Sequence, residues 1–72
     1  MQEYSRILIE EYCMNHNSVK SRHLAKLVKM SYDLYAEATD EDAVFLEKAI
    51  DNEKQPELKE ALEDLEEFLF PW

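Results

Sequence analysis

Hydrophobic residues recur at intervals of three and four along most of this chain, and that spacing is typical of amphipathic helices rather than strands. The first such stretch predicts a helix over residues 2–14. Its apolar arc has a central stripe and two flanks: Met1, Tyr4, Leu8 and Tyr12 form the stripe, with Ile7 on one side and Ile9 and Cys13 on the other. An arc this broad indicates contacts on two sides.

The clearest periodicity predicts a second helix over residues 22–38, with Ser18 or Ser21 as its N-cap. The side expected to be buried comprises Leu24, Leu27, Val28, Ser31, Tyr35 and Ala38. The opposite side carries charges and is expected to face the solvent: Arg22, Lys26, Lys29, Asp33 and Glu37.

Two further helices follow. Thr39 with Asp42 three residues later is a variant of the capping box, and it predicts a helix that ends near Asp51. Pro56 suits the first position of a last helix, which Pro71 cannot continue. The faces expected to be buried are Ala43, Leu46, Ala49 and Ile50 in the third helix, and Leu58, Ala61, Leu62, Leu65, Phe68 and Leu69 in the last. The pattern predicts an all-α fold, a compact bundle of four short-to-medium helices, as a single domain over residues 1–72.

Composition supports a packed domain and narrows its setting. The chain is 46% hydrophobic and 35% charged and has no glycine, which is globular rather than disordered in character. Cys13 is its one cysteine, so an intramolecular disulfide is impossible and a disulfide-stapled secreted scaffold is excluded. Residues 1–6 lack the features of a signal peptide, and no apolar run approaches the roughly 20 residues of a membrane span. We therefore expect a cytoplasmic protein without membrane contacts.

Charge divides the chain into two parts. Residues 1–38 hold equal numbers of acids and bases, whereas residues 39–72 hold twelve acids against three lysines and so account for the whole net charge of −9. In the last helix Glu60, Glu63, Asp64 and Glu67 lie three or four residues apart with only Lys59 nearby. Such like-charge neighbours repel one another, so stability does not explain the arrangement.

These four acids predict a surface for a basic partner, which is either another protein or Lys26 and Lys29 of the second helix in the same or another copy. A homodimer is one form of this prediction. The alternative is a hydrated face that keeps a small protein soluble.

The tail after this acidic stretch is aromatic. Phe68 and Leu69 continue the predicted core stripe, whereas Phe70 points elsewhere and is, with Trp72, a candidate anchor for a partner. Residues 68–72 resemble the acidic, aromatic-ended tails of single-stranded-DNA-binding proteins. Closure of the core is the favoured interpretation of this tail.

A second function is DNA binding. Lys20, Arg22, Lys26 and Lys29 form a basic segment without an acid between Tyr12 and Tyr32, and residues 18–31 resemble the first helix and turn of a helix-turn-helix domain. In this resemblance Lys29 occupies the turn position where glycine is usual. The recognition helix would be residues 32–38, which include two acids and no base. DNA binding by a degenerate helix-turn-helix is therefore the runner-up, and a solvated basic face is its alternative.

Catalytic and metal sites find little support. Cys13 and His16 have the spacing of half a zinc site and His23 follows, but the chain contains no second half-site. A core thiol and two surface histidines explain these residues, and without glycine there is no Gly-rich phosphate loop. We expect no cofactor, no metal and no catalytic residue.

The run of residues 42–45 after a polar turn, with the length and helical content, resembles the small nucleoid-associated haemolysin-modulating family. That resemblance covers four positions and assigns no function. The leading interpretation is a non-enzymatic, acidic protein–protein interaction module (an adaptor, inhibitor or regulatory subunit) that presents its last helix to a basic surface.

Overall fold

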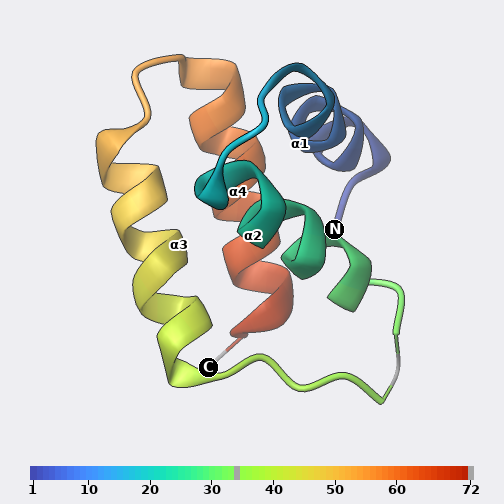
Figure 1. The fold of residues 1–72 in the computed structure, drawn as a ribbon. Coiled ribbons are helices and arrows are strands. Elements are labelled where there is room, and N and C mark those ends of the chain that lie inside the picture. Colours follow the sequence, from blue (N-terminus) through green and yellow to red (C-terminus); the bar gives the residue numbers. More distant parts are fainter. Residues whose placement is uncertain (34, 72) are drawn as a thin grey trace.

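A computed structural model describes residues 1–33 and 35–71 of the chain. It contains four α-helices, which are α1 (Glu3–Asn15), α2 (Val19–Met30), α3 (Asp40–Asn52) and α4 (Pro56–Leu69) (Figure 1). The described part contains no strand. Its Cα radius of gyration is 11.0 Å, close to the roughly 11 Å expected of a compact chain of this length. The predicted all-α bundle of four helices is confirmed.

Capping side chains explain where α2 and α3 begin. The Ser18 hydroxyl accepts the Ser21 N–H at 3.1 Å, and the Ser21 hydroxyl accepts the Ser18 N–H at 2.9 Å. At α3 the Thr39 hydroxyl accepts the Asp42 N–H at 3.2 Å, and the Asp42 carboxylate accepts the Thr39 N–H at 3.0 Å. Each reciprocal pair satisfies two donors at a helix start, so the capping box predicted at Thr39 is confirmed.

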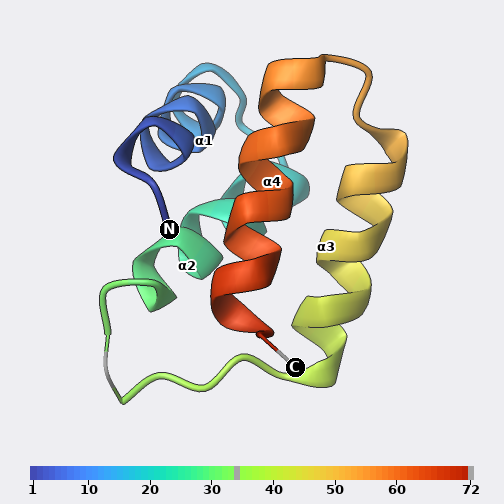
Figure 2. The same cartoon turned by 180° about the vertical axis from the view of Figure 1, so that it is seen from behind.

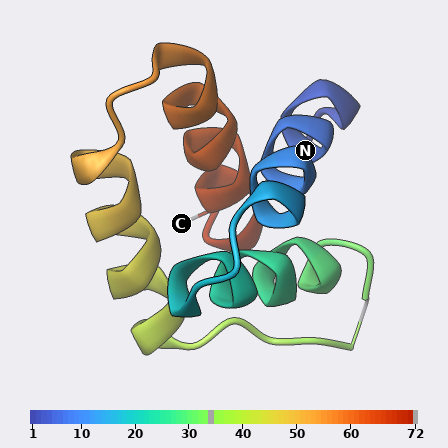
Figure 3. The same cartoon turned by 45° about the horizontal axis from the view of Figure 1, so that its top comes forward.

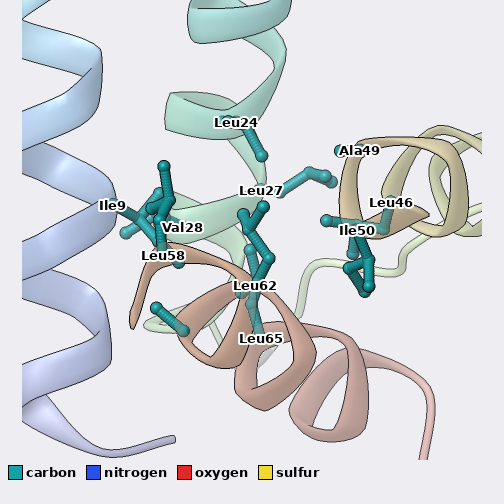
Figure 4. Packing of buried hydrophobic residues seen from close by; sticks show 11 residues of the cluster. Ile9, Leu24, Leu27, Val28, Leu46, Ala49, Ile50, Leu58, Leu62 and Leu65 are labelled. Atoms are coloured by element: carbon teal, nitrogen blue, oxygen red, sulfur yellow. The ribbon is translucent and has the colours of Figure 1, made fainter. Parts of the chain in front are cut away.

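The helices pack around α4. Figure 2 shows α4 between α1 and α3, and Figure 1 shows α2 crossing the other side of the bundle. Six side chains from all four helices are fully buried where these elements meet (Figure 4): Ile9, Leu24, Leu27, Leu46, Leu62 and Leu65. The buried faces of α3 and α4 therefore agree closely with the periodicity of the sequence.

For α2 the structure confirms Ser18, one of the two predicted N-caps, but not the predicted bounds of residues 22–38. The helix begins at Val19, because Ser18 caps it, and it ends at Met30 rather than residue 38. Beyond it the Ser31 hydroxyl donates to the Val28 carbonyl, and the Asp33 carboxylate accepts the Tyr35 N–H at 2.9 Å. Such local bonds compete with helix propagation. The chain then returns alongside α2 to the start of α3 (Figure 3), and Tyr35, expected in the core, is 94% exposed.

The predicted stripe of α1 was also rotated. Ser5 and Ile9 form its buried centre, whereas Tyr4 and Ile7 are exposed. The helix contacts both α4 and α2, so its buried arc is centred between the stripe of Tyr4 and the flank of Cys13.

At the end of α4 the burial of Phe68 and Phe70 is the reverse of the prediction. Phe68 is exposed, whereas Phe70 is partly buried against the core. The helix ends at Leu69, and Phe70 takes non-helical angles (φ −131°, ψ 70°) while its N–H donates to the Glu66 carbonyl at 2.8 Å. This change of direction returns its ring to the core, so the predicted outward direction of Phe70 is wrong. Trp72 lies outside the described residues.

This reversal predicts unequal effects of two matched truncations. Phe70→Ala removes a ring packed against the core and is expected to lower the free energy of unfolding by about 1–2 kcal/mol, less than for a fully buried phenylalanine. Phe68→Ala removes an exposed ring and is expected to cost less than about 0.5 kcal/mol. Urea unfolding followed by circular dichroism measures both. A larger cost for Phe68→Ala than for Phe70→Ala contradicts the placement.

Candidate functional site

The outer side of α4 carries a row of carboxylates, here called the acidic ridge, made of Glu60, Glu63 and Glu67 with Asp64 at its edge. The first three are exposed and Asp64 is half-buried. They occupy the side of α4 opposite the leucines of the core. Figure 2 shows α4 in front of α2, so the side of α4 that is turned away from α2 is the outer one. Among the described residues no salt bridge includes any of these four acids. The ridge is thus a negative surface without an ion-pair partner among the described residues.

Asp64 differs from the other members because it has a partner within the chain. Its Oδ2 accepts the backbone N–H of Gln2 at 2.9 Å. Gln2 is the N-cap of α1 and provides no side-chain cap, so Asp64 places a negative charge at the positive end of that helix. This residue therefore helps to join α4 to α1.

The negative surface extends from the ridge onto α1. Tyr4 donates its phenolic hydrogen to Glu57 Oε2 at 3.0 Å. This hydrogen bond, and then the charge of the same carboxylate, raises the pKa of the Tyr4 phenol. The tyrosine consequently remains a neutral donor at the edge of the acidic surface.

On its other flank the ridge meets the acids of α3. Glu66 is half-buried, and burial followed by the charges of Glu47, Glu63 and Asp51 raises the pKa of its carboxyl group. Like charges therefore crowd this side of α4, as the sequence predicted for the last helix.

The basic residues of α2 lie on the opposite side of the molecule. Arg22, Lys26 and Lys29, here called the basic stripe, are exposed on the side of α2 opposite its buried residues. Figure 1 shows α2 in front of α4, on the other side of the bundle. Arg22 donates to the Asn17 side-chain oxygen at 3.0 Å, and within the described residues neither lysine forms a salt bridge.

Lys20 does not belong to this stripe, although the sequence grouped it there. Its Nζ lies 3.9 Å from Glu53 Oε1 and 5.3 Å from the centre of the Tyr12 ring. Lys20 precedes Arg22 by two residues, which is about half a turn of helix, so it lies on a different side of α2 from the stripe.

The bases of α2 do not neutralise the acidic ridge of α4 within one molecule. The basic stripe and the acidic ridge face opposite directions (Figures 1 and 2), and no ion pair joins them in the described part of the chain. The intramolecular form of the predicted pairing is therefore not found. A second molecule is needed to bring such charges together.

The geometry does not form a helix-turn-helix. The residues predicted as its recognition helix, 32–38, are not helical where the structure describes them. Nine residues separate Met30 from the next helix, which begins at Asp40, whereas the turn of the motif has three or four. That helix carries three acids in its first turn, which would face phosphates in a major-groove complex.

A buried polar pair joins α2 to α3, and the sequence did not reveal it. His23 Nε2 lies 2.8 Å from Asp42 Oδ1, and the imidazole stacks on Phe45 with ring centres 3.8 Å apart. His23 is half-buried rather than a surface histidine, and Asp42 is only 4% exposed. The spacing of Asp42 to Leu46 on the buried face of α3 was the available signal for this burial.

The possible zinc ligands are separated. Cys13 Sγ donates to the Ser21 carbonyl at 3.3 Å, His16 stacks on Tyr12, and His23 faces α3. No group of three possible ligands occurs within residues 1–33 and 35–71. Burial, and then the charge of Glu10, raises the pKa of the Cys13 thiol, which disfavours the nucleophilic thiolate.

None of the described helices is both long and apolar enough to span a membrane.

No family model matches this chain. Comparisons with curated proteins and with solved structures also give no match. The resemblances to helix-turn-helix domains, to single-stranded-DNA-binding tails and to the haemolysin-modulating family therefore rest on the quoted residues, and function has to be argued from the surfaces described above.

The buried Asp42 predicts how stability depends on pH. Burial alone would raise the pKa of this carboxyl, but hydrogen bonds from Thr39 and His23 outweigh burial and lower it below its ordinary value of 3.8. A lowered folded-state pKa stabilises the fold above the unfolded-state value, and this contribution is lost as the pH falls through the folded-state value. Urea unfolding between about pH 2 and 6 should show this loss, and Asp42→Asn should reduce it.

Glu66 supplies a control of opposite sign. Its raised pKa means that the folded state favours the protonated carboxyl, so its charge destabilises the fold at neutral pH. Glu66→Gln is therefore expected to increase stability at pH 7. A decrease for this variant, or an unchanged acid dependence for Asp42→Asn, contradicts these assignments.

Proposed function

We propose that this protein is a non-enzymatic interaction module, acting as an adaptor, inhibitor or regulatory subunit, that presents the acidic ridge of α4 to a basic surface of another protein. The observation that carries the proposal is the absence of a compensating base: within the described residues no salt bridge includes Glu60, Glu63 or Glu67. The core face of α4 holds the ridge in place, because Leu58, Ala61, Leu62 and Leu65 are buried beneath it.

Energetics favour a binding role over a purely structural one. Like charges three or four residues apart on a helix each cost a few tenths of a kcal/mol. In a domain whose core supplies about 3–5 kcal/mol, several such pairs are a noticeable loss. A basic partner offsets this repulsion, and the exposed ridge also accelerates its encounter with that partner at low ionic strength.

The basic stripe supports a second candidate, DNA association, more weakly. Arg22, Lys26 and Lys29 share one exposed line without an intervening acid. Three bases neutralise few phosphates, and a net charge of −9 repels a polyanion. A small acidic protein surface is therefore a better partner for the basic stripe than a DNA duplex is.

Two variants of equal charge test the proposal. Glu63→Lys/Glu67→Lys reverses the centre of the ridge, whereas Glu11→Lys/Glu37→Lys makes the same change of charge at exposed positions outside α4. Binding of a labelled oligolysine peptide is measured by fluorescence anisotropy at several salt concentrations. We expect the ridge variant to raise the Kd at least about tenfold, equivalent to about 1.4 kcal/mol, and the control less than about threefold.

The salt dependence is part of the same test, because wild-type affinity is expected to fall steeply as salt screens the ridge. Equal losses in the two variants mean that net charge rather than the ridge determines binding, and that result refutes the proposal.

A further inference from the structure

A groove between α1 and α2 adjoins the basic stripe. It has a volume of about 720 Å³ and a largely apolar lining that includes Met14, Val28, Met30 and Tyr32, with Lys26 and Lys29 beside it. Two acids also border it, but both are engaged: Glu10 pairs with Arg6 at 2.8 Å, and Asp33 accepts the Tyr35 N–H. The groove therefore combines an apolar lining with two lysines that form no salt bridge within the described residues.

The acidic ridge has the complementary composition. Phe68 follows Glu67 directly in α4 and is 48% exposed, so its ring lies at the flank of the carboxylates, where it borders a shallow hollow with Met30 and Ala36 of the same molecule. A basic and apolar surface on α2 thus corresponds to an acidic and aromatic surface on α4 of the same chain.

The spacing of the charges agrees as well. The basic stripe has intervals of four and three residues, from Arg22 to Lys26 to Lys29, and Glu60, Glu63 and Glu67 have intervals of three and four. At a rise of 1.5 Å per residue each row spans about 10.5 Å. When the two helices lie parallel, Glu60 is opposite Arg22, Glu67 is opposite Lys29, and Glu63 lies within one residue of the position opposite Lys26, so that Phe68 lies beside Met30 at the groove.

We propose that the basic surface recognised by the acidic ridge is the α2 stripe and groove of a second copy of this chain, with Phe68 covered by the groove. The inference rests on the proposed function, because it names the partner of the same ridge. The two surfaces face opposite directions in one molecule, so the contact is head-to-tail and continues from copy to copy instead of closing into a symmetric dimer (Figures 1 and 2).

The contact is weak by the same reasoning. Exposed ion pairs contribute little each, and one ring in a groove buries a small area. The net charge of −9 opposes encounter, although at an ionic strength of 0.15 M the Debye length of about 8 Å screens distant charges. These terms predict weak and reversible association that is seen only at high protein concentration.

Charge exchange tests the inference in the full chain. At about 0.15 M salt, sedimentation equilibrium should show an average mass that rises with concentration up to about 1 mM. Glu63→Lys/Glu67→Lys and Lys26→Glu/Lys29→Glu each present surfaces of one sign and should remain monomeric. Their equimolar mixture should associate again, because each variant then meets the opposite charge. Phe68→Ala should weaken wild-type association several-fold.

The outcomes separate this inference from the function on which it rests. Lys26→Glu/Lys29→Glu keeps the acidic ridge, so it should bind oligolysine at least as well as the wild type. A wild type that stays monomeric, or a mixture that fails to associate while both variants retain wild-type helical circular dichroism, overturns head-to-tail contact. Ridge-dependent binding of oligolysine in that event leaves the proposed function intact, whereas its loss removes both.

Discussion

Replacing Leu62 by alanine is expected to remove most of the free energy of unfolding at 25 °C. Leu62 is fully buried in α4, where all four helices contribute to the core (Figure 4). Truncation of a buried leucine costs about 2–5 kcal/mol, and a domain of this size has about 3–5 kcal/mol to lose. Helical circular dichroism and the urea midpoint measure the effect.

Val44→Ala is the matched control for this truncation. Val44 is 53% exposed on the outer side of α3, so its replacement should change the free energy of unfolding by less than about 0.5 kcal/mol. A Leu62→Ala protein that unfolds at the same urea concentration as Val44→Ala contradicts the described core.

The second large effect is expected for Asp42→Ala. This carboxylate is buried, accepts the Thr39 N–H at 3.0 Å and bonds His23 at 2.8 Å. Removing it ends a capping box and leaves the imidazole without its partner, which together cost about 2–4 kcal/mol. Asp40→Ala removes an exposed acid from the same helical turn and should cost about 0.3–1 kcal/mol through the helix dipole.

A double-mutant cycle with His23→Ala isolates the pair. Since the two side chains touch, the two single variants should together lose at least about 0.5 kcal/mol more free energy of unfolding than the double variant loses. If the two losses are strictly additive, the contact between His23 and Asp42 contributes nothing to stability. That result contradicts the buried pair.

Local signals allowed much of this fold to be predicted. Thr39 and Pro56 fixed the starts of α3 and α4, because capping and proline geometry act within a few residues of the chain. The faces of those helices followed from periodicity, since each packs its buried side on one continuous core. The end of α2 did not follow, because Tyr35 and Ala38 continue the helical spacing while Asp33 bonds the backbone locally instead.

The site was predicted in part for similar reasons. The repulsion of Glu60, Glu63 and Glu67 is visible in their spacing along one helix. The bond between Asp64 and Gln2 joins residues 62 positions apart, and that between His23 and Asp42 spans 19. Such pairs depend on how helices cross, which single-helix periodicity does not specify. The opposed directions of ridge and stripe likewise emerge only from the tertiary arrangement.

Titration of the ¹⁵N-labelled wild-type chain with oligolysine, followed by amide chemical shifts, tests directly whether the acidic ridge of α4 is the binding surface for basic partners. We expect the largest changes on α4 at Glu60, Glu63 and Glu67. Largest changes at the acids of α3 or in residues 35–39, or changes of equal size at every exposed acid, would contradict this expectation.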